Sequence, residues 1–128
     1  MRQAYAHEGV VVMAPGSDER APGGAITVAL CGALDHEPPC PLAAHHTAAE
    51  RRGAELHLRI LFAAPPDRCG EVRGRIDAAL GAGSFTGPDG RTTTWRTLRT
   101  ECSTVAPGER AHAKRLLHGG GRPAGTTP

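Results

Sequence analysis

Apolar and polar residues alternate along residues 55–62. Four apolar side chains share one side of this segment and three polar ones share the other, namely Leu56, Leu58, Ile60 and Phe62 against Glu55, His57 and Arg59. Since successive side chains of a strand point to opposite sides, the pattern predicts a half-buried β-strand. The apolar segments 10–14 and 25–31 are also predicted to be strands. Residues 15–24 between them are rich in turn-forming residues, so we expect these two strands to be antiparallel neighbours.

Two later segments show apolar residues at helical spacing. The first follows Asp67, a helix N-cap residue, and ends before Gly83; its apolar positions are Cys69, Val72, Ile76, Ala79 and Leu80. The second can open at Pro107 and places Ala113, Leu116 and Leu117 on the side that faces the sheet. Residues 47–50 have the Thr-x-x-Glu form of a capping box, which predicts one additional helical turn.

The predicted elements follow the order β-β-β-α-β-α once the Thr-rich segment 92–100 is counted as a strand. This order predicts an α+β fold in which an antiparallel sheet of about four strands has two helices packed on one face. A chain of 128 residues suits one packed core. We therefore expect a single α+β domain over residues 1–118 and a disordered tail over residues 119–128.

The net charge and the amino-terminal residues argue against a nucleic-acid-binding, secreted or membrane protein. The formal net charge is only +2, although residues 91–122 hold seven basic and two acidic side chains. With few aromatic residues and no helix-turn-helix pattern, the chain is not expected to bind nucleic acid. Residues 1–12 do not resemble a secretory leader and no segment is long and apolar enough to cross a membrane, so we expect a cytoplasmic protein with reduced thiols and no membrane contact.

Residues 31–46 form a Cys-, His- and Pro-rich segment that the pattern places in a loop. Its five soft or borderline metal ligands are Cys31, His36, Cys40, His45 and His46. Thiolate and imidazole at short spacings are the ligands that Zn²⁺ prefers, and three prolines stiffen the chain around them. Asp35 and Glu37 could add carboxylate oxygens. The sequence therefore predicts a zinc-binding accessory or regulatory domain, with Cys31, His36, Cys40 and either His45 or His46 as ligands.

Two alternatives stay open because these spacings match no common zinc finger or ribbon. In the first, the segment only connects strands, and the protein is a metal-free interaction domain that associates with an unknown protein or with itself through a sheet edge or helix face. In the second, Cys40 is the nucleophile of a small thiol enzyme, activated by a neighbouring histidine. The prolines around Cys40 argue against this enzyme, since they leave few backbone N–H groups for an oxyanion hole. His57 becomes a further ligand if the loop covers its side of the strand.

Overall fold

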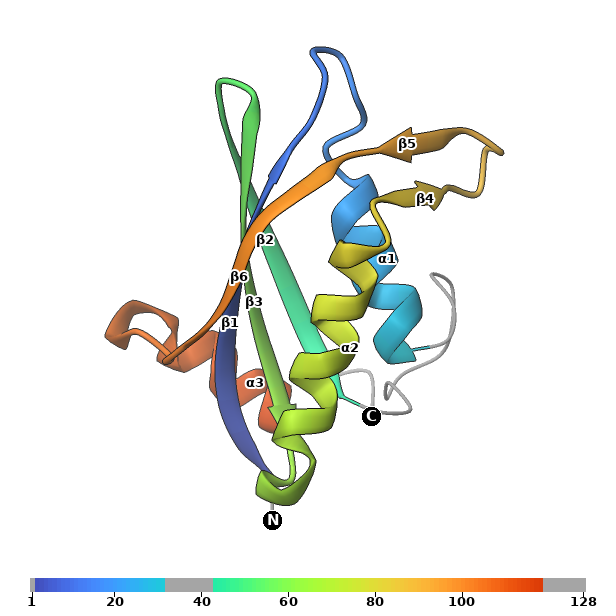
Figure 1. Cartoon of the computed structure of the whole chain (residues 1–128). Helices are drawn as coiled ribbons and strands as arrows, with labels where there is room; N and C mark the ends of the chain where they lie inside the picture. Colours follow the sequence, from blue (N-terminus) through green and yellow to red (C-terminus); the bar gives the residue numbers. More distant parts are fainter. Residues whose placement is uncertain (1, 32–42, 119–128) are drawn as a thin grey trace.

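A four-stranded antiparallel sheet with the strand order β2-β3-β1-β6 forms the centre of the structure (Figure 1). The computed structural model describes residues 2–31 and 43–118. The strands of this sheet are β1 (Gln3–Val12), β2 (Ala44–Arg52), β3 (Glu55–Ala64) and β6 (Arg96–Ser103). The helices are α1 (Ala21–Cys31), α2 (Cys69–Gly81) and α3 (Arg110–Leu117), with short 3-10 turns η1 (Pro66–Arg68) and η2 (Pro107–Glu109). Two short strands, β4 (Ser84–Thr86) and β5 (Thr92–Thr94), form a separate hairpin.

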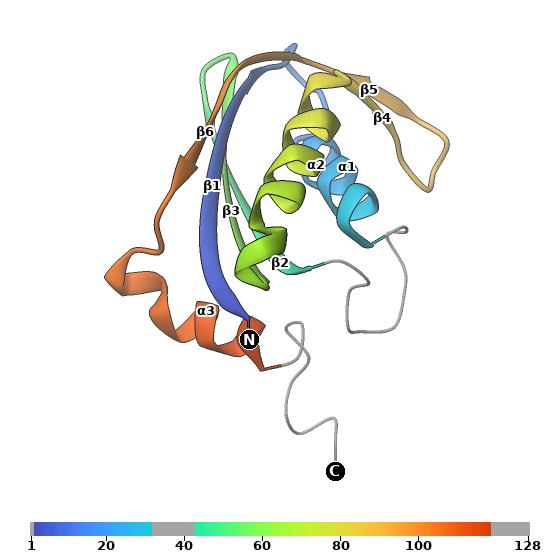
Figure 2. The ribbon, with the colours of Figure 1, turned by 60° about the horizontal axis from the view of Figure 1, so that its bottom comes forward.

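The helices divide between the two faces of the sheet (Figure 2). Helices α1 and α2 lie side by side on one face, whereas α3 lies on the other face, at one end of the strands. If α3 and the β4-β5 hairpin are left out, the elements follow the order β-α-β-β-α-β. Strands β1 and β2, which α1 connects, are not adjacent in the sheet, because β3 lies between them. This connectivity is the split β-α-β, or ferredoxin-like, arrangement. No helix among the described residues is long and apolar enough to span a membrane.

The prediction of an α+β fold with a four-stranded antiparallel sheet is confirmed, but two elements were wrong. Residues 25–31 belong to helix α1, because Ile26 and Leu30 are one helical turn apart and both are buried, whereas Val28 is 36% exposed. Residues 47–50 lie in strand β2, where pairing with β3 satisfies the backbone groups that a helical turn would have used. Over residues 2–31 and 43–118 the structure therefore has three helices on two faces rather than two on one.

The face covered by α1 and α2, hereafter the helix-covered face, holds the main core. The alternating apolar residues of β3 are all buried on this face, as predicted, and they meet Val72, Ile76 and Leu80 of α2. From α1, Ile26 and Leu30 complete the layer. The other face has a smaller apolar cluster under α3, formed by Ala6, Ala44, Leu61, Ala63 and Leu116. Helix α3 covers only one end of that face, and the uncovered end is the candidate site.

Candidate functional site

The uncovered end of the second face is hollowed into a groove with a volume of about 490 Å³. All four strands of the large sheet contribute to its lining. Three acidic and three basic side chains line it together with His57, namely Glu8, Glu50 and Glu101 with Arg52, Arg59 and Arg99. The groove is therefore polar and close to neutral, which does not suit the polyanionic backbone of a nucleic acid. A pocket of this size in a small protein is the default candidate for a binding site.

Strand register places these side chains in rows that cross the sheet. Val10 of β1 pairs with Arg99 on one side and His57 on the other, and His57 pairs with Glu50 of β2. Residues directly opposite one another on paired strands share a face. The row therefore runs from Arg99 at one edge of the groove to Glu50 at the other edge, with Val10 and His57 between them. Glu8, Arg59, Ala48 and Glu101 form the next row, on the side nearer α3.

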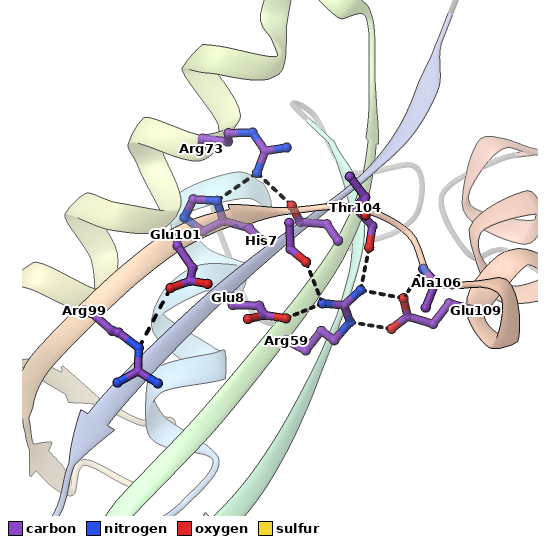
Figure 3. Close-up of polar contacts among 11 residues, drawn as sticks. His7, Glu8, Arg59, Arg73, Arg99, Glu101, Thr104, Ala106 and Glu109 are labelled. Atoms are coloured by element: carbon purple, nitrogen blue, oxygen red, sulfur yellow. Dashed lines mark hydrogen bonds and ion pairs between the residues drawn. The ribbon is translucent and has the colours of Figure 1, made fainter.

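Arg59 is the centre of the polar network at the α3 end of the groove (Figure 3). Its Nε and Nη2 atoms donate to the two carboxylate oxygens of Glu109 at 2.6 and 2.7 Å. Its Nη1 atom donates to the Glu8 carboxylate and to Ser103 Oγ, and Nη2 also donates to the Thr104 carbonyl at 2.7 Å. A guanidinium has five N–H donors, and all five are used here. Arg59 therefore ties β3 to β1, to the end of β6 and to η2, and it holds the groove together rather than serving a ligand.

Glu109 takes its electrostatic character from this contact. The hydrogen bonds from Arg59 lower the pKa of the Glu109 carboxyl to about 2, and a hydrogen bond from the Ala106 backbone N–H acts in the same direction against the effect of burial. The same pairing raises the pKa of Arg59. Glu109 stands immediately before α3, so this ion pair fastens the start of that helix to the sheet.

The other charges of the groove are held loosely. Arg99 and Glu101 are 3.8 Å apart and 59% and 58% exposed, and Arg52 and Glu50 are 2.9 Å apart and 59% and 66% exposed. The hydrogen bond from Arg52 lowers the pKa of Glu50. Exposed ion pairs of this kind contribute little to folding, about 0 to 1 kcal/mol each, so their partners can be exchanged at small cost. These four side chains can therefore bind the charges of another molecule.

His7 lies on the helix-covered face and is 2% exposed. Arg73 of α2 donates to its Nδ1 atom at 2.9 Å and to the Ala6 carbonyl at 2.7 Å (Figure 3). Because a guanidinium can only donate, His7 Nδ1 accepts, and Nε2 carries the proton that it donates to Asp77 at 2.7 Å. Both ring nitrogens are thus occupied, and the ring joins β1 to α2 without a free position for catalysis.

Two of the predicted metal ligands, Cys31 and His45, come together in the structure. Cys31 ends α1 and His45 stands near the start of β2, and the Sγ atom lies 3.7 Å from His45 Nδ1. His45 Nε2 is within hydrogen-bond distance of Thr27 Oγ1, at 3.1 Å. Cys31 is disulfide-bonded, which differs from the expectation of reduced thiols, so its sulfur can ligate a metal ion only after reduction.

The other predicted ligands do not join this pair in the described part of the chain. His46 points to the opposite face of the sheet, where its ring centre is 4.3 Å from that of His112 in α3. Burial and the neighbouring His46 and Arg115 lower the pKa of His112, although Glu109 opposes them. His36 and Cys40 lie outside the described residues, as do Asp35 and Glu37. Within residues 2–31 and 43–118, no group of three or more Cys, His, Asp and Glu side chains is arranged to hold a metal ion.

The sequence patterns predicted only some of the residues that line the groove. The alternation in β3 correctly placed His57 and Arg59 on the polar side, but it offered no partner for either residue. His57 in fact bonds to Glu55 at 2.9 Å and is 23% exposed. The residues of β2 and β6 were missed, since their approach to β3 depends on strand register, which the sequence does not display. The available signal was the run of alternating charges at Arg99 and Glu101, two residues apart and hence on one side of a strand.

Comparisons with protein-family models, with curated proteins and with solved structures gave no match to this chain. The functional argument accordingly depends on the geometry of the groove and on the positions of the predicted ligands.

Proposed function

We propose that this protein is a non-enzymatic interaction domain that binds a protein partner in the groove on the α3 side of its sheet. The observation that carries this proposal is the set of exposed, loosely paired charges at the two edges of the groove, Arg99 with Glu101 and Glu50 with Arg52. These four side chains are more than half exposed, so their ion pairs contribute little to folding. Opposed charges of this kind speed association and select the partner more than they raise affinity.

The balance of charges indicates the chemistry of the partner. Three acidic and three basic residues line the groove, so a surface of mixed or locally opposite charge fits it better than an apolar one. Val10 at the base of the groove is only 4% exposed, so the groove presents little apolar surface to an apolar ligand. The groove therefore favours a polar protein surface that replaces the weak internal pairs with intermolecular ones.

Site-specific photocrosslinking in the cells that produce the protein tests this proposal. A small diazirine amino acid at Ala48, which is exposed on the groove side of β2, should yield one protein adduct identified by mass spectrometry. The matched control is the same substitution at Ala78, an exposed residue of α2 on the opposite side of the sheet. Loss of the Ala48 adduct on Glu101→Lys would support the groove as the binding surface. Equal adducts at both sites, or none at Ala48, would overturn the proposal.

A second candidate is the zinc-binding domain predicted from the sequence, which the approach of Cys31 to His45 favours. In the reduced protein a thiolate and an imidazole at this separation can both contact one Zn²⁺ ion. Elemental analysis of untagged protein purified under reducing conditions should then find about one Zn²⁺ per chain. Cys40→Ser should remove the metal, whereas the control Cys102→Ser, at an exposed free thiol, should retain it. Metal-free wild-type protein would overturn this candidate.

A further inference from the structure

We propose that the molecule that occupies the groove is a second copy of this chain, and that the part inserted is helix α3. This inference rests on the proposed function and names the partner. It starts from a steric observation: α3 stands on the same face as the groove, over the neighbouring end of strands β1 and β3. Helix α3 stands off the sheet on this face (Figure 2), so a molecule that approaches meets a raised helix beside the groove.

Symmetry selects one way for two such faces to meet. A two-fold axis parallel to the strands would place the two α3 helices against each other and hold the sheets apart. A two-fold axis perpendicular to the strands places each α3 opposite the groove of the other copy. Such a contact is isologous, so every favourable interaction is made twice. The raised helix and the hollow of one face thus complement the hollow and the helix of its copy.

The dimensions agree with this placement. An α-helix with its side chains is about 10–12 Å wide. The groove extends along β1 from Glu8 to at least Val10, and Val12 lies on the same side of that strand. The four residue-to-residue steps from Glu8 to Val12 span about 13 Å of strand. One helix therefore fits across the uncovered end of the sheet.

Charge gives the second, independent argument. The outward side of α3 is basic, since Arg110, Lys114 and Arg115 are exposed and the helix has no acidic residue. Within the described part of the chain, none of these three cations forms an ion pair. The groove offers Glu50 and Glu101, both more than half exposed. Insertion of α3 would give these cations carboxylate partners that they lack in the isolated chain.

Charge reversal on either side of this contact tests the inference. The full chain should be a dimer by light scattering coupled to gel filtration over a dilution series. Glu50→Lys with Glu101→Lys should weaken dimerisation at least about tenfold, and Arg110→Glu with Lys114→Glu should do the same. A control with the same change in net charge as the groove variant, Glu19→Lys with Glu71→Lys on exposed residues away from the groove, should remain a dimer. Thermal unfolding of each variant confirms that it is folded.

Mixing the two reversed variants gives the decisive result. The groove of one would then be basic and would face the acidic α3 of the other, while the two unaltered surfaces would also meet, so an equimolar mixture should form heterodimers. A wild-type monomer at every concentration, or a mixture that stays monomeric, would overturn the inference. If Ala48 still crosslinks to a different protein in that case, the proposed function stands and only the identity of the partner is wrong.

Discussion

The two faces of the sheet are built from the same four strands, yet they differ in nearly every physical respect. On the helix-covered face, Leu56, Ile60 and Phe62 are almost inaccessible to solvent under α1 and α2. On the groove face, the intervening residues His57 and Arg59 bond to carboxylates and remain in contact with solvent. One strand can therefore stabilise the fold through the side chains on one face and form a recognition surface with those on the other face. Changes to the first face should therefore affect folding, and changes to the second should affect binding.

The largest effect on folding is expected from Phe62→Ala on the helix-covered face. Phe62 is fully buried, its ring stacks on Tyr5 at 5.4 Å, and the Arg73 guanidinium lies 5.4 Å from its centre. Removing such a ring leaves a cavity and should lower the free energy of unfolding by about 3–5 kcal/mol in urea titrations. Leu98→Ala, at a side chain that is 40% exposed, is the control and should cost less than about 1 kcal/mol. Equal losses for the two variants would contradict the division between the faces.

The next largest effect concerns Glu109, the carboxylate that Arg59 binds at the α3 end of the groove. Its pKa of about 2 lies below the ordinary value of 4.5, so the folded state binds the proton less readily than the unfolded state. The stabilisation is therefore fully present above pH 4.5 and is lost as the pH falls toward 2. The difference between a pKa of 4.5 and one of about 2 corresponds to at most about 3.4 kcal/mol, and less where solvent screens the ion pair.

Glu109→Gln isolates this contribution from the other carboxylates. At neutral pH the variant should be about 2–3 kcal/mol less stable than the wild type, since Arg59 loses its charged partner. Because the glutamine does not titrate, the difference between the two proteins in urea titrations should shrink as the pH approaches 2. A difference that stays constant over the acid range would show that Glu109 acts through packing and not through its charge.

A smaller effect is expected at Gly9, where β1 approaches α2. A Cβ atom at this position would lie 2.7 Å from Leu80 Cδ1, so Gly9→Ala overpacks the core and should cost about 1–3 kcal/mol by thermal unfolding. Gly74→Ala is the matched control, because nothing lies within 4 Å of a Cβ there and the residue is inside helix α2. This control should gain about 0.4–1 kcal/mol. A stabilised Gly9→Ala variant would mean that α2 can move away from β1 freely.

The smallest effect on folding is expected from Glu101→Gln in the groove. Glu101 is 58% exposed and 3.8 Å from Arg99, so its loss should change the free energy of unfolding by less than about 0.5 kcal/mol. The same substitution should measurably weaken dimerisation, which gel filtration with light scattering can follow. A large loss of stability would place this side chain in the fold and not in the binding surface.

The sequence was informative where one periodicity dominated. Strand β3 and helices α2 and α3 were predicted because their apolar residues repeat at one spacing only. Most of these residues are buried as expected, whereas Cys69, Ala79 and Leu117 are half-buried. Helix α1 was mistaken for a strand because Ile26, Val28 and Leu30 alternate, although exposed Val28 plays no part in the core. Strand β2 has too few apolar residues to show a strand pattern, and its place is set by pairing with β3. The groove could not be predicted for the same reason, since its charges come from strands that are distant in sequence. The predicted zinc site stays a prediction.

The position of β1 has a consequence for how the chain is made. Of the four strands of the sheet this one is synthesised first, yet it is a central strand whose neighbours are β3 and β6. The backbone groups of Val10 and Val11 therefore cannot all be paired until residues up to Ser103 have been synthesised. Nascent chains that stop before β6 would present β1 as an open sheet edge, which is prone to aggregate. We therefore expect β1 to need shielding from other chains until β3 and β6 have paired with it.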